Sequence, residues 1–405
     1  MNFKRLPSFT EEYFLKKHIN TIFDFYHPKC IDSKGGFFHI YLSDGKISKP
    51  HSRHLVNSTR FVINYARMAT INKDSSLLQH CTHGLDFIEA IHGSADSDQY
   101  YWELDNNQPV VKNDYCYGWV FVLLAYAEAI NCGLTSYKES LYSTYERMNQ
   151  KFWQAQHQLY ADEFGPDKKL TSYRGQNANM HAVEALLSCY QATNDGQFLE
   201  RAYVIASRIT NDLADANSQL IWEHFTSDWE IDWQYNIDKP DDMFRPWGFQ
   251  TGHQTEWAKL LLILFQRKPE AWMVEKAEYL FNQAMELGWD STYGGLVYGF
   301  DPSGDACDTD KHFWVHAESF AAASYLYKVT KNTRYLDDYQ RIWEYAWNSL
   351  VDHEHGAWHH KLTREGHLMS NIKSPLGKND YHTLGACYDV LNAFSDLMKP
   401  NNINR

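Results

Sequence analysis

The chain has 405 residues, 44% of them hydrophobic, and a formal net charge of -13. This acidic balance argues against a nucleic-acid partner or an anionic membrane surface and favours a neutral substrate. No apolar run approaches the roughly 20 residues of a membrane span, and the N-terminal stretch MNFKRLPSFTEEYF lacks the apolar core of a signal peptide. Seven scattered cysteines without a CxxC pair favour reduced thiols, so we expect a cytoplasmic protein with no membrane attachment.

Aromatic residues make up 16% of the chain, with 14 Trp, 27 Tyr and 22 Phe. Side chains of this size supply a thick hydrophobic core, and they also form the stacking walls of carbohydrate clefts. Core packing is the more common role for any single one of them. The excess as a whole is compatible with both uses.

A short segment rich in glycine, aromatic residues and alternating polarity recurs six times. The copies lie at 35–46, 98–110, 157–170, 218–232, 294–305 and 356–367. Their anchors, Gly36, Tyr100, Leu159, Leu220, Gly295 and Gly356, are 64, 59, 61, 75 and 61 positions apart. A near-constant period indicates a repeat architecture. Each repeat leaves about 45 residues after its hairpin-like segment, which is enough for two helices and a turn.

Apolar residues recur at three- and four-residue spacing between these segments, which predicts helices. The predicted helices include 55–69, 118–130, 179–193, 255–266, 270–288 and 315–330. Several are apolar on nearly all sides, as expected of helices enclosed by a second ring. Six repeats of two helices predict an all-α fold, an (α/α)6 barrel with short hairpins at one mouth, and residues 1–405 as one catalytic domain. An open α-solenoid is the alternative, which the long repeat disfavours.

One polar cluster falls near the start of a predicted inner helix in each repeat. The six clusters are Arg60, Tyr117, His181 with Glu184, His253 with Glu256, Trp314 with Glu318, and His382. In a closed ring, all of these side chains would face one axis. The barrel therefore predicts a deep cleft lined by the starts of the inner helices.

Two of the clusters have the spacing HxxE, which places both side chains on one helical face. A carboxylate beside an imidazole raises its basicity and fixes its tautomer, which suits a histidine that moves protons near neutral pH. An exposed ion pair is the alternative for each motif. Asn179 is expected to cap its helix, and Gly252 to allow a tight turn before His253.

Three chemistries fit such a cleft. A metal enzyme could use the two HxxE pairs as ligands, and an inverting glycosidase could draw its two carboxyl groups from the three glutamates. A proton-transfer enzyme acting on a sugar carbonyl would use histidine bases, with a cation to stabilise an enediolate. The third chemistry also uses Arg60 and His382, which the first two leave idle, and on the residues alone it is favoured only slightly.

The segments YRGQNANMHAVEA (173–185), WGFQTGHQTEWAKL (247–260), FWVHAES (313–319) and NDYHTLG (379–385) resemble the N-acylglucosamine 2-epimerase superfamily. Within that superfamily the chain is most similar to the bacterial aldose–ketose isomerases that act on mannose. The resemblance extends over nearly the whole chain, and it implies an (α/α)6 barrel. It also implies chemistry on an unmodified monosaccharide through a cis-enediolate, without a metal or other cofactor.

Site residues follow from the resemblance, motif by motif. It implies that His382 carries the proton between C1 and C2, that His253 assists ring opening as a second acid or base, and that Arg60 stabilises the enediolate. The implied substrate-binding residues are His181, Glu184, Glu256, Glu318, Tyr117, Trp314 and Asn177, with Tyr117 and Trp314 on the cleft wall. The expected reaction is the interconversion of D-mannose and D-fructose, possible also for D-lyxose and D-xylulose. A sugar 2-epimerase is the nearest alternative, and an (α/α)6 glycosidase or a non-catalytic sugar-binding barrel is more remote.

The chain departs from the family pattern at one position. Isomerases of this kind often have Trp four residues before the active-site arginine, where this chain has Val56 before Arg60. The corresponding part of the sugar-contacting wall is therefore altered or supplied from elsewhere. Arg174 and Arg245 are candidates for contacting the substrate or anchoring loops. The loop 229–250 is a candidate lid, because excluding water protects an enediolate, and a static surface loop is the equal alternative. The oligomeric state is left open.

Overall fold

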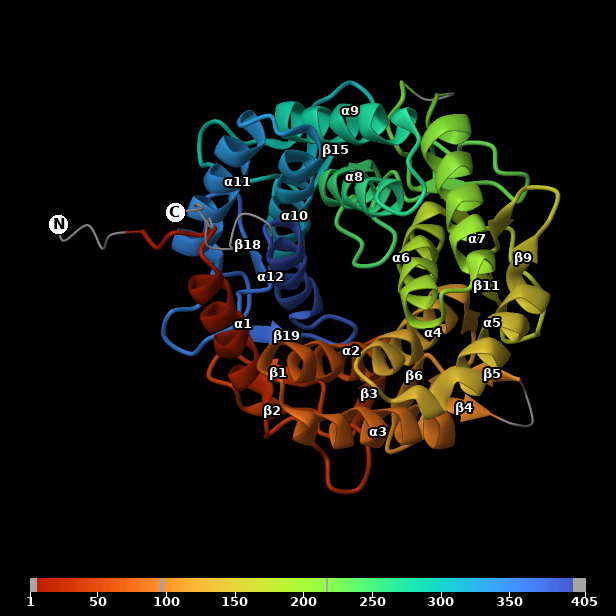
Figure 1. Ribbon diagram of the computed structural model, residues 1–405. Helices are drawn as coiled ribbons and strands as arrows, with labels where there is room; N and C mark the ends of the chain where they lie inside the picture. Colours follow the sequence, from red (N-terminus) through yellow and green to blue (C-terminus); the bar gives the residue numbers. More distant parts are fainter. Residues whose placement is uncertain (1–5, 95–97, 216–217, 396–405) are drawn as a thin grey trace, which may run out of the picture.

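Two concentric rings of α-helices make up the computed structural model, which describes residues 6–94, 98–215 and 218–395 (Figure 1). The inner ring consists of α2 (Leu55–Asn72), α4 (Cys116–Asn131), α6 (Gln176–Thr193), α8 (Thr251–Phe265), α10 (Phe313–Thr330) and α12 (Tyr381–Ala393). The outer ring consists of α1 (Glu12–Tyr26), α3 (Leu78–Phe87), α5 (Lys138–Phe152), α7 (Gly196–Ser207), α9 (Ala271–Gly288) and α11 (Arg334–Tyr345). Each inner helix packs against its two inner neighbours and against one outer helix.

The two rings differ in burial, as their sequences require. In α4 and α10 nearly every side chain is buried, because both faces of an inner helix meet protein. Outer helices such as α11 bury one face only. Short 3-10 turns precede α3 (Ser75–Leu77) and α5 (Thr135–Tyr137). π-Helical turns extend α3 (Ile88–His92), α7 (Arg208–Leu213) and α11 (Ala346–Leu350).

The predicted inner helices are present; α2 begins at Leu55 as predicted, whereas the other four begin two to four residues earlier than the apolar pattern indicated. The segment predicted at 179–193 begins at Gln176, and the one predicted at 255–266 begins at Thr251. The polar residues ahead of the apolar run therefore lie within the first helical turn. This shift matters because it puts their side chains on the inner helices themselves rather than on the preceding loops.

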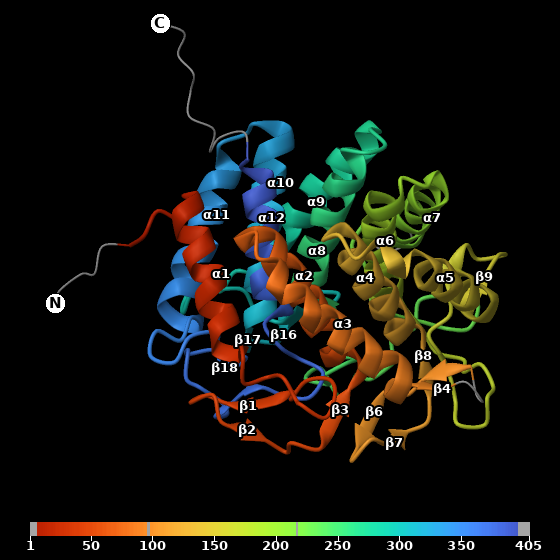
Figure 2. The ribbon, with the colours of Figure 1, turned by 60° about the horizontal axis from the view of Figure 1, so that its bottom comes forward.

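Short strands gather at one end of the barrel, where the hairpin-like segments were predicted (Figure 2). Those of the first half are β1 (Ile40–Leu42), β2 (Ile47–Ser48), β3 (Ser52–His54), β4 (Gly93–Ser94), β5 (Gln99–Tyr100), β6 (Glu103–Asp105), β7 (Gln108–Val111), β8 (Asp114–Tyr115), β9 (Trp153–Gln154), β10 (Leu159–Tyr160) and β11 (Glu163–Phe164). Those of the second half are β12 (Arg174–Gly175), β13 (His224–Phe225), β14 (Phe249–Gln250), β15 (Gly299–Phe300), β16 (Ala306–Asp308), β17 (Lys311–His312), β18 (Lys361–Leu362) and β19 (Ile372–Ser374).

These strands connect each repeat to the next. The strand just before each inner helix pairs antiparallel with a strand of the following hairpin: β3 with β6, β8 with β11, β12 with β13, β14 with β15, β17 with β18, and β19 with β1. The last of these pairs joins the end of the chain to its beginning, and α12 packs against α1 and α2. The ring is therefore closed, which confirms the (α/α)6 barrel and excludes the open solenoid.

The described residues contain no helix that combines the length and the hydropathy needed to cross a bilayer. All seven cysteines are free thiols.

Candidate active site

A cavity of about 420 Å³ opens at the mouth that carries the strands. Its floor comes from the starts of the inner helices, and one side comes from residues 235–246 of the candidate lid. Of the predicted site residues, the cavity is lined by Tyr117, Asn177, His253 and Trp314. The other predicted residues lie in the layer beneath this floor, in contact with one another.

His382, at the start of α12, pairs with a carboxylate from the neighbouring inner helix. Its Nδ1 lies 2.7 Å from Oε1 of Glu318 on α10, and its Nε2 lies 3.3 Å from a terminal nitrogen of the Arg60 guanidinium. Since a carboxylate accepts at Nδ1 and an arginine donates at Nε2, the hydrogen bonds fit a neutral imidazole with its proton on Nδ1. Burial, with Arg60 as the next cause, holds the pKa of His382 well below its usual value. The Nε2 atom is therefore a base at neutral pH.

His253, in the first turn of α8, does not pair with Glu256 as its HxxE spacing predicted. Its Nδ1 lies 2.8 Å from Oε1 of Glu223, which comes from the loop before β13. Gln176 donates to the other carboxylate oxygen of Glu223 at 3.0 Å and so fixes its orientation. Sequence reasoning missed Glu223 because it lies in a hairpin-like segment and not on an inner helix. The fourth hairpin-like segment, which begins SQLIWEHF, was the available signal, since its glutamate comes directly before a strand.

The second HxxE pair forms as predicted. Nδ1 of His181 lies 2.9 Å from Oε2 of Glu184, and Oε1 of Glu184 accepts a hydrogen bond from the hydroxyl of Tyr381. Burial lowers the pKa of His181, which Glu184 partly offsets. The ring of His181 packs edge-on against Tyr117, 5.1 Å between centroids.

Glu256 lies between His181 and His382. Its Oε1 lies 3.9 Å from Nδ1 of His181. A carboxylate oxygen of Glu256 lies within 4.8 Å of a side-chain oxygen of Glu318 and a ring nitrogen of His382. Burial and the charge of Glu318 raise the pKa of Glu256 well above its usual value. Its Oε2 is buried without a hydrogen-bond partner among the described residues. This environment favours the protonated form of Glu256, which can donate a hydrogen bond.

Arg60 links these groups to the cavity wall. Its guanidinium stacks between the rings of Phe121 and Tyr381, 4.7 and 4.8 Å from their centroids, and donates to the hydroxyl of Tyr117 at 3.3 Å. Burial, opposed by Arg60, raises the pKa of Tyr117 to about 12, so its hydroxyl stays protonated. A buried cation fixed by two aromatic rings is a preorganised partner for a developing oxyanion.

The wall around these residues is aromatic. Trp314 lies between the two catalytic candidates, with ring centroids 5.1 Å from His253 and 5.7 Å from His382. Val56 lines the cavity, and Trp102 from the hairpin segment 98–110 lines it as well. An indole wall is thus supplied from another segment. The side-chain oxygen of Asn177 is buried and lacks a partner among the described residues, so it is available to a ligand.

Lys378 also lines the cavity, four residues before His382, and the sequence analysis missed it. Burial, and then the charge of Arg60, lower the pKa of its ammonium group to about 7. A lysine four residues before a candidate catalytic histidine was the signal available in the sequence. Its nitrogen lies 5.9 Å from the ring centroid of Phe244, a residue of the candidate lid.

Two supporting residues have other roles than their sequence positions indicated. Asn179 does not cap α6; it lies inside the first turn and bonds the backbone N–H and C=O of Tyr160 at 2.8 and 3.0 Å, while Gly175 holds the N-cap position. Gly252 does not form a turn; it lies within α8, where a Cβ atom would come 2.3 Å from the Trp314 ring. The indole therefore packs directly against the α8 backbone.

The two arginines near the mouth are loop anchors in the structure. Arg174 donates to the carbonyl oxygens of Thr171 and Tyr173 and to Gln154. Arg245 bridges the candidate lid to β11 through Glu163 at 2.7 Å, and it lies 3.9 Å above the ring centroid of Tyr173. Arg245 lines the cavity, whereas the Arg174 hydrogen bonds all go to the surrounding loops.

Two groups of three side chains have donor atoms close enough to hold a metal ion: His181, Glu184 and Glu256, and Glu256, Glu318 and His382. Each group contains a glutamate paired with a protein cation, Glu184 with Arg67 at 3.9 Å and Glu318 with Lys259. Lys259 lies 2.5 Å from Glu318, and Arg60 lies against Nε2 of His382. A divalent cation would have to compete with these two side chains, so the second group in particular fits hydrogen bonding better than metal ligation.

A closed double ring of helices with two histidine–carboxylate pairs beneath a polar, aromatic cavity defines a barrel enzyme equipped for proton transfer. The chain belongs to the N-acylglucosamine 2-epimerase (GlcNAc 2-epimerase) family, whose model matches residues 36–386. It is 47% identical over 387 residues to a D-mannose isomerase of Marinomonas mediterranea, covering 95% of this chain and 98% of that protein. A crystal structure of a D-mannose isomerase superposes with a TM-score of 0.94 at 46% identity, covering 96% of this chain and 99% of the other.

A cellobiose 2-epimerase from Spirochaeta thermophila shares the fold at greater distance. Its TM-score is 0.83 at 18% identity, covering 96% of this chain and 98% of that one. Identity at this level supports the architecture alone. The sequence prediction of the family is confirmed.

Proposed function

We propose that the protein is an aldose–ketose isomerase that interconverts D-mannose and D-fructose. The observation that carries the proposal is the neutral His382, oriented by Glu318 at 2.7 Å and facing Arg60 through its Nε2. This is a base beside a fixed cation, the pair that removal of a proton α to a carbonyl requires. Likeness to D-mannose isomerases over nearly the full chain supports mannose as the substrate.

Ring opening is the first step of the proposal. Conversion of a cyclic sugar to its open-chain aldehyde needs a proton moved from the C1 hydroxyl to the ring oxygen. His253 lines the cavity and is oriented by Glu223, so it is the group placed to move that proton. Trp314, Trp102 and Tyr117 provide flat apolar faces for the sugar, and Asn177 offers a free amide oxygen to a hydroxyl.

Proton transfer follows on the open chain. Nε2 of His382 removes the proton from C2, and the charge that develops on the oxygen is stabilised by Arg60. The hydroxyl proton of O2 passes to O1, and return of the same carbon-bound proton to C1 then gives the ketose. The carboxyl of Glu256, in its protonated form, donates a hydrogen bond to a substrate oxygen, while His181, oriented by Glu184, holds a further hydroxyl. These roles stand as proposals for each residue.

The proposal includes no metal ion, because the ammonium group of Lys259 already pairs with the Glu318 carboxylate beneath the cavity. Residues 1–405 are proposed to act as one catalytic domain. A cytoplasmic location is proposed on the seven free thiols.

An assay of the purified protein on a panel of sugars tests the function. D-Fructose should form from D-mannose at a rate unchanged by EDTA. Formation of D-glucose ahead of fructose would replace the proposal with a 2-epimerase, and release of sugar from a mannoside would replace it with a glycosidase. Loss of activity in EDTA, restored by a divalent metal, would overturn the metal-independent mechanism.

A further inference from the structure

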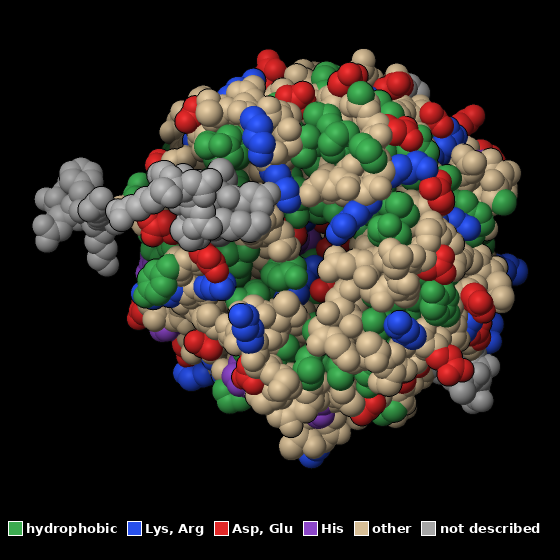
Figure 3. Space-filling view, viewed as in Figure 1, with side chains coloured by type: hydrophobic (Ala, Val, Ile, Leu, Met, Phe, Trp, Pro, Cys, Tyr) green, Lys and Arg blue, Asp and Glu red, His purple; other side chains and the backbone are tan. Residues whose placement is uncertain are grey.

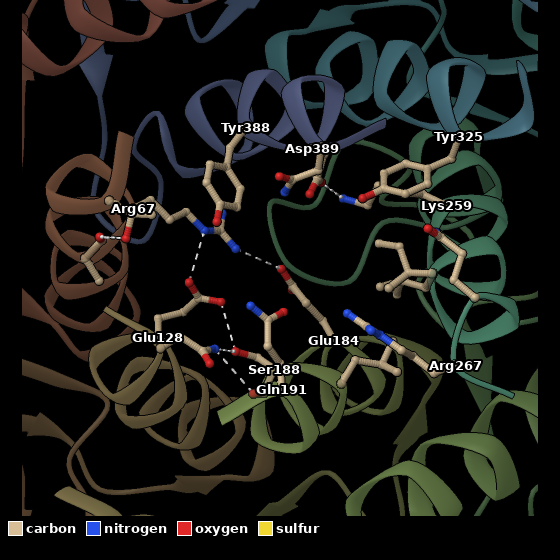
Figure 4. Close-up of a pocket in the computed structure, with 18 of the residues that line it drawn as sticks. Arg67, Glu128, Glu184, Ser188, Gln191, Lys259, Arg267, Tyr325, Tyr388 and Asp389 are labelled. Carbon is tan, nitrogen blue, oxygen red and sulfur yellow. Dashed lines mark hydrogen bonds and ion pairs between the residues drawn. The ribbon is translucent and has the colours of Figure 1, made fainter. Parts of the chain in front are cut away.

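A second cavity, of about 400 Å³, opens at the opposite mouth of the barrel, towards the C-terminal ends of the inner helices. Residues from all six inner helices line it. Figure 3 faces this mouth and shows a central hollow bordered by lysine and arginine side chains. The rear cavity, as we call it, is lined by charged and polar groups, among them Arg67, Glu128, Glu184, Lys259 and Asp389 (Figure 4). The mechanism described above leaves this cavity without a role.

Lys259 connects the rear cavity to the catalytic layer. It lies on α8, six residues after His253, and its side chain is only 6% exposed. Its Nζ lies 2.5 Å from Oε2 of Glu318 and 3.2 Å from a carboxylate oxygen of Asp389. The other oxygen of Glu318 is the one that holds His382. A continuous line of hydrogen bonds and ion pairs therefore runs from the rear cavity through Glu318 to the imidazole.

We propose that Lys259 is a positioning residue for His382, acting through Glu318, and that the rear cavity gives small solutes access to it from the side opposite the substrate. The proposal rests on the proposed function of the site. A carboxylate that bridges an ammonium and an imidazole has both oxygens fixed, so it can hold only one orientation of the ring. Lys259 also supplies a positive charge that offsets the cost of burying the Glu318 carboxylate.

The ammonium group of Lys259 stays protonated in this environment. Burial works against it, but Glu318 and Asp389 raise the pKa of its ammonium group well above the usual value. The titratable and charged groups around His382 are Glu318 from α10, Arg60 from α2, His181 and Glu184 from α6, Glu256 from α8, Tyr381 from α12 and Lys378 from the preceding loop. Lys259, paired with Asp389, lies on the other side of Glu318. Removing this cation favours the protonated imidazole, so the pKa of His382 should rise.

Lys259→Ala provides the test. We expect kcat for mannose to fall about tenfold or more, with KM changed less than about twofold because Lys259 does not line the substrate cavity. The acid limb of the pH profile should move to higher pH. Millimolar ethylammonium or propylammonium should restore activity by entering the rear cavity, without competing with mannose. Lys259→Arg should retain most of the activity, and Arg267→Ala, which removes an exposed cation from the same cavity, should match the parent.

Two further measurements keep the test decisive. Lys259→Met preserves the packing of the stem and replaces the alanine variant if circular dichroism shows that alanine prevents folding. Imidazole ¹⁵N shifts of His382 report its protonation without turnover, so they test Lys259 even if the parent proves inactive on mannose. A loss of activity that no alkylammonium restores, together with unchanged His382 shifts, would reduce Lys259 to a structural residue and overturn the proposal. Parental kcat in Lys259→Ala would do the same.

Discussion

Nδ1 of His253 lies 2.8 Å from a carboxylate oxygen of Glu223, a residue 30 positions earlier in the chain. His253 begins an inner helix, whereas Glu223 belongs to the loop that leads into β13. His382 has an analogous partner in Glu318 of the adjacent inner helix. Each candidate acid–base group is thus oriented by a carboxylate from a different element, so the relative placement of the elements fixes the chemistry.

Glu223→Gln should lower kcat on mannose by about 10- to 100-fold. The amide can still contact the imidazole, but it does not stabilise the protonated form that arises when His253 takes up a proton. Steady-state kinetics on mannose measure the effect, with the exposed neighbour variant Glu230→Gln as the control. A Glu223→Gln enzyme as fast as the parent would show that His253 needs no carboxylate.

Glu256 and Glu318 should respond differently to the same substitution. Glu318→Gln should remove most of the activity, since the carboxylate that accepts from His382 and pairs with Lys259 is lost. Glu256→Gln should stay within about tenfold of the parent, because the raised pKa of Glu256 makes it a neutral donor that an amide can replace. Comparison of kcat/KM for the two variants decides the matter. Equal losses would mean that Glu256 acts as an ion.

His382 should remain neutral at pH values where an exposed histidine is half protonated. Its pKa is depressed by burial and by Arg60, so its neutral, basic form persists as the pH falls through 6.5 and is lost only further down. ¹⁵N NMR of histidine-labelled protein measures this titration, with His382→Asn assigning the signal. A midpoint at or above 6.5 would contradict the buried geometry.

Arg245 should contribute to substrate capture more than to chemistry. It ties the 229–250 segment to β11 through Glu163 and lines the cavity, but it contacts neither His253 nor His382. Arg245→Ala is expected to raise KM several-fold and to change kcat less. Lys239→Ala, an exposed change in the same segment, is the control. An unchanged KM would argue that this segment does not close over the sugar.

The architecture of this chain could be predicted because it follows from periodic patterns in the sequence. Six hairpin-like segments at near-constant spacing and apolar runs of helical period define the number and order of the elements. The helix starts were displaced because residues such as Gln176 and Thr251 are polar, although their side chains are buried in the interior of the ring. A prediction based on apolar periodicity does not detect polar residues that are buried at the start of a helix.

The candidate site was predictable where its contacts are local. The pair of His181 and Glu184 lies on one helix, and the spacing alone brings the two together. The pair expected of His253 and Glu256 does not form, because α8 turns Glu256 towards His181 while a loop delivers Glu223 to His253. Contacts between elements depend on how the ring closes, which no spacing along a single helix records.

The central claim is that His382 carries a proton between C2 and C1 of mannose. NMR of D-mannose in D2O with the parent enzyme and with His382→Asn tests it most directly, with circular dichroism confirming that the variant is folded. The account predicts fructose as the first product of the parent and no turnover by the variant. Glucose appearing before fructose, or a variant that still makes fructose at near-parental rate, would contradict it.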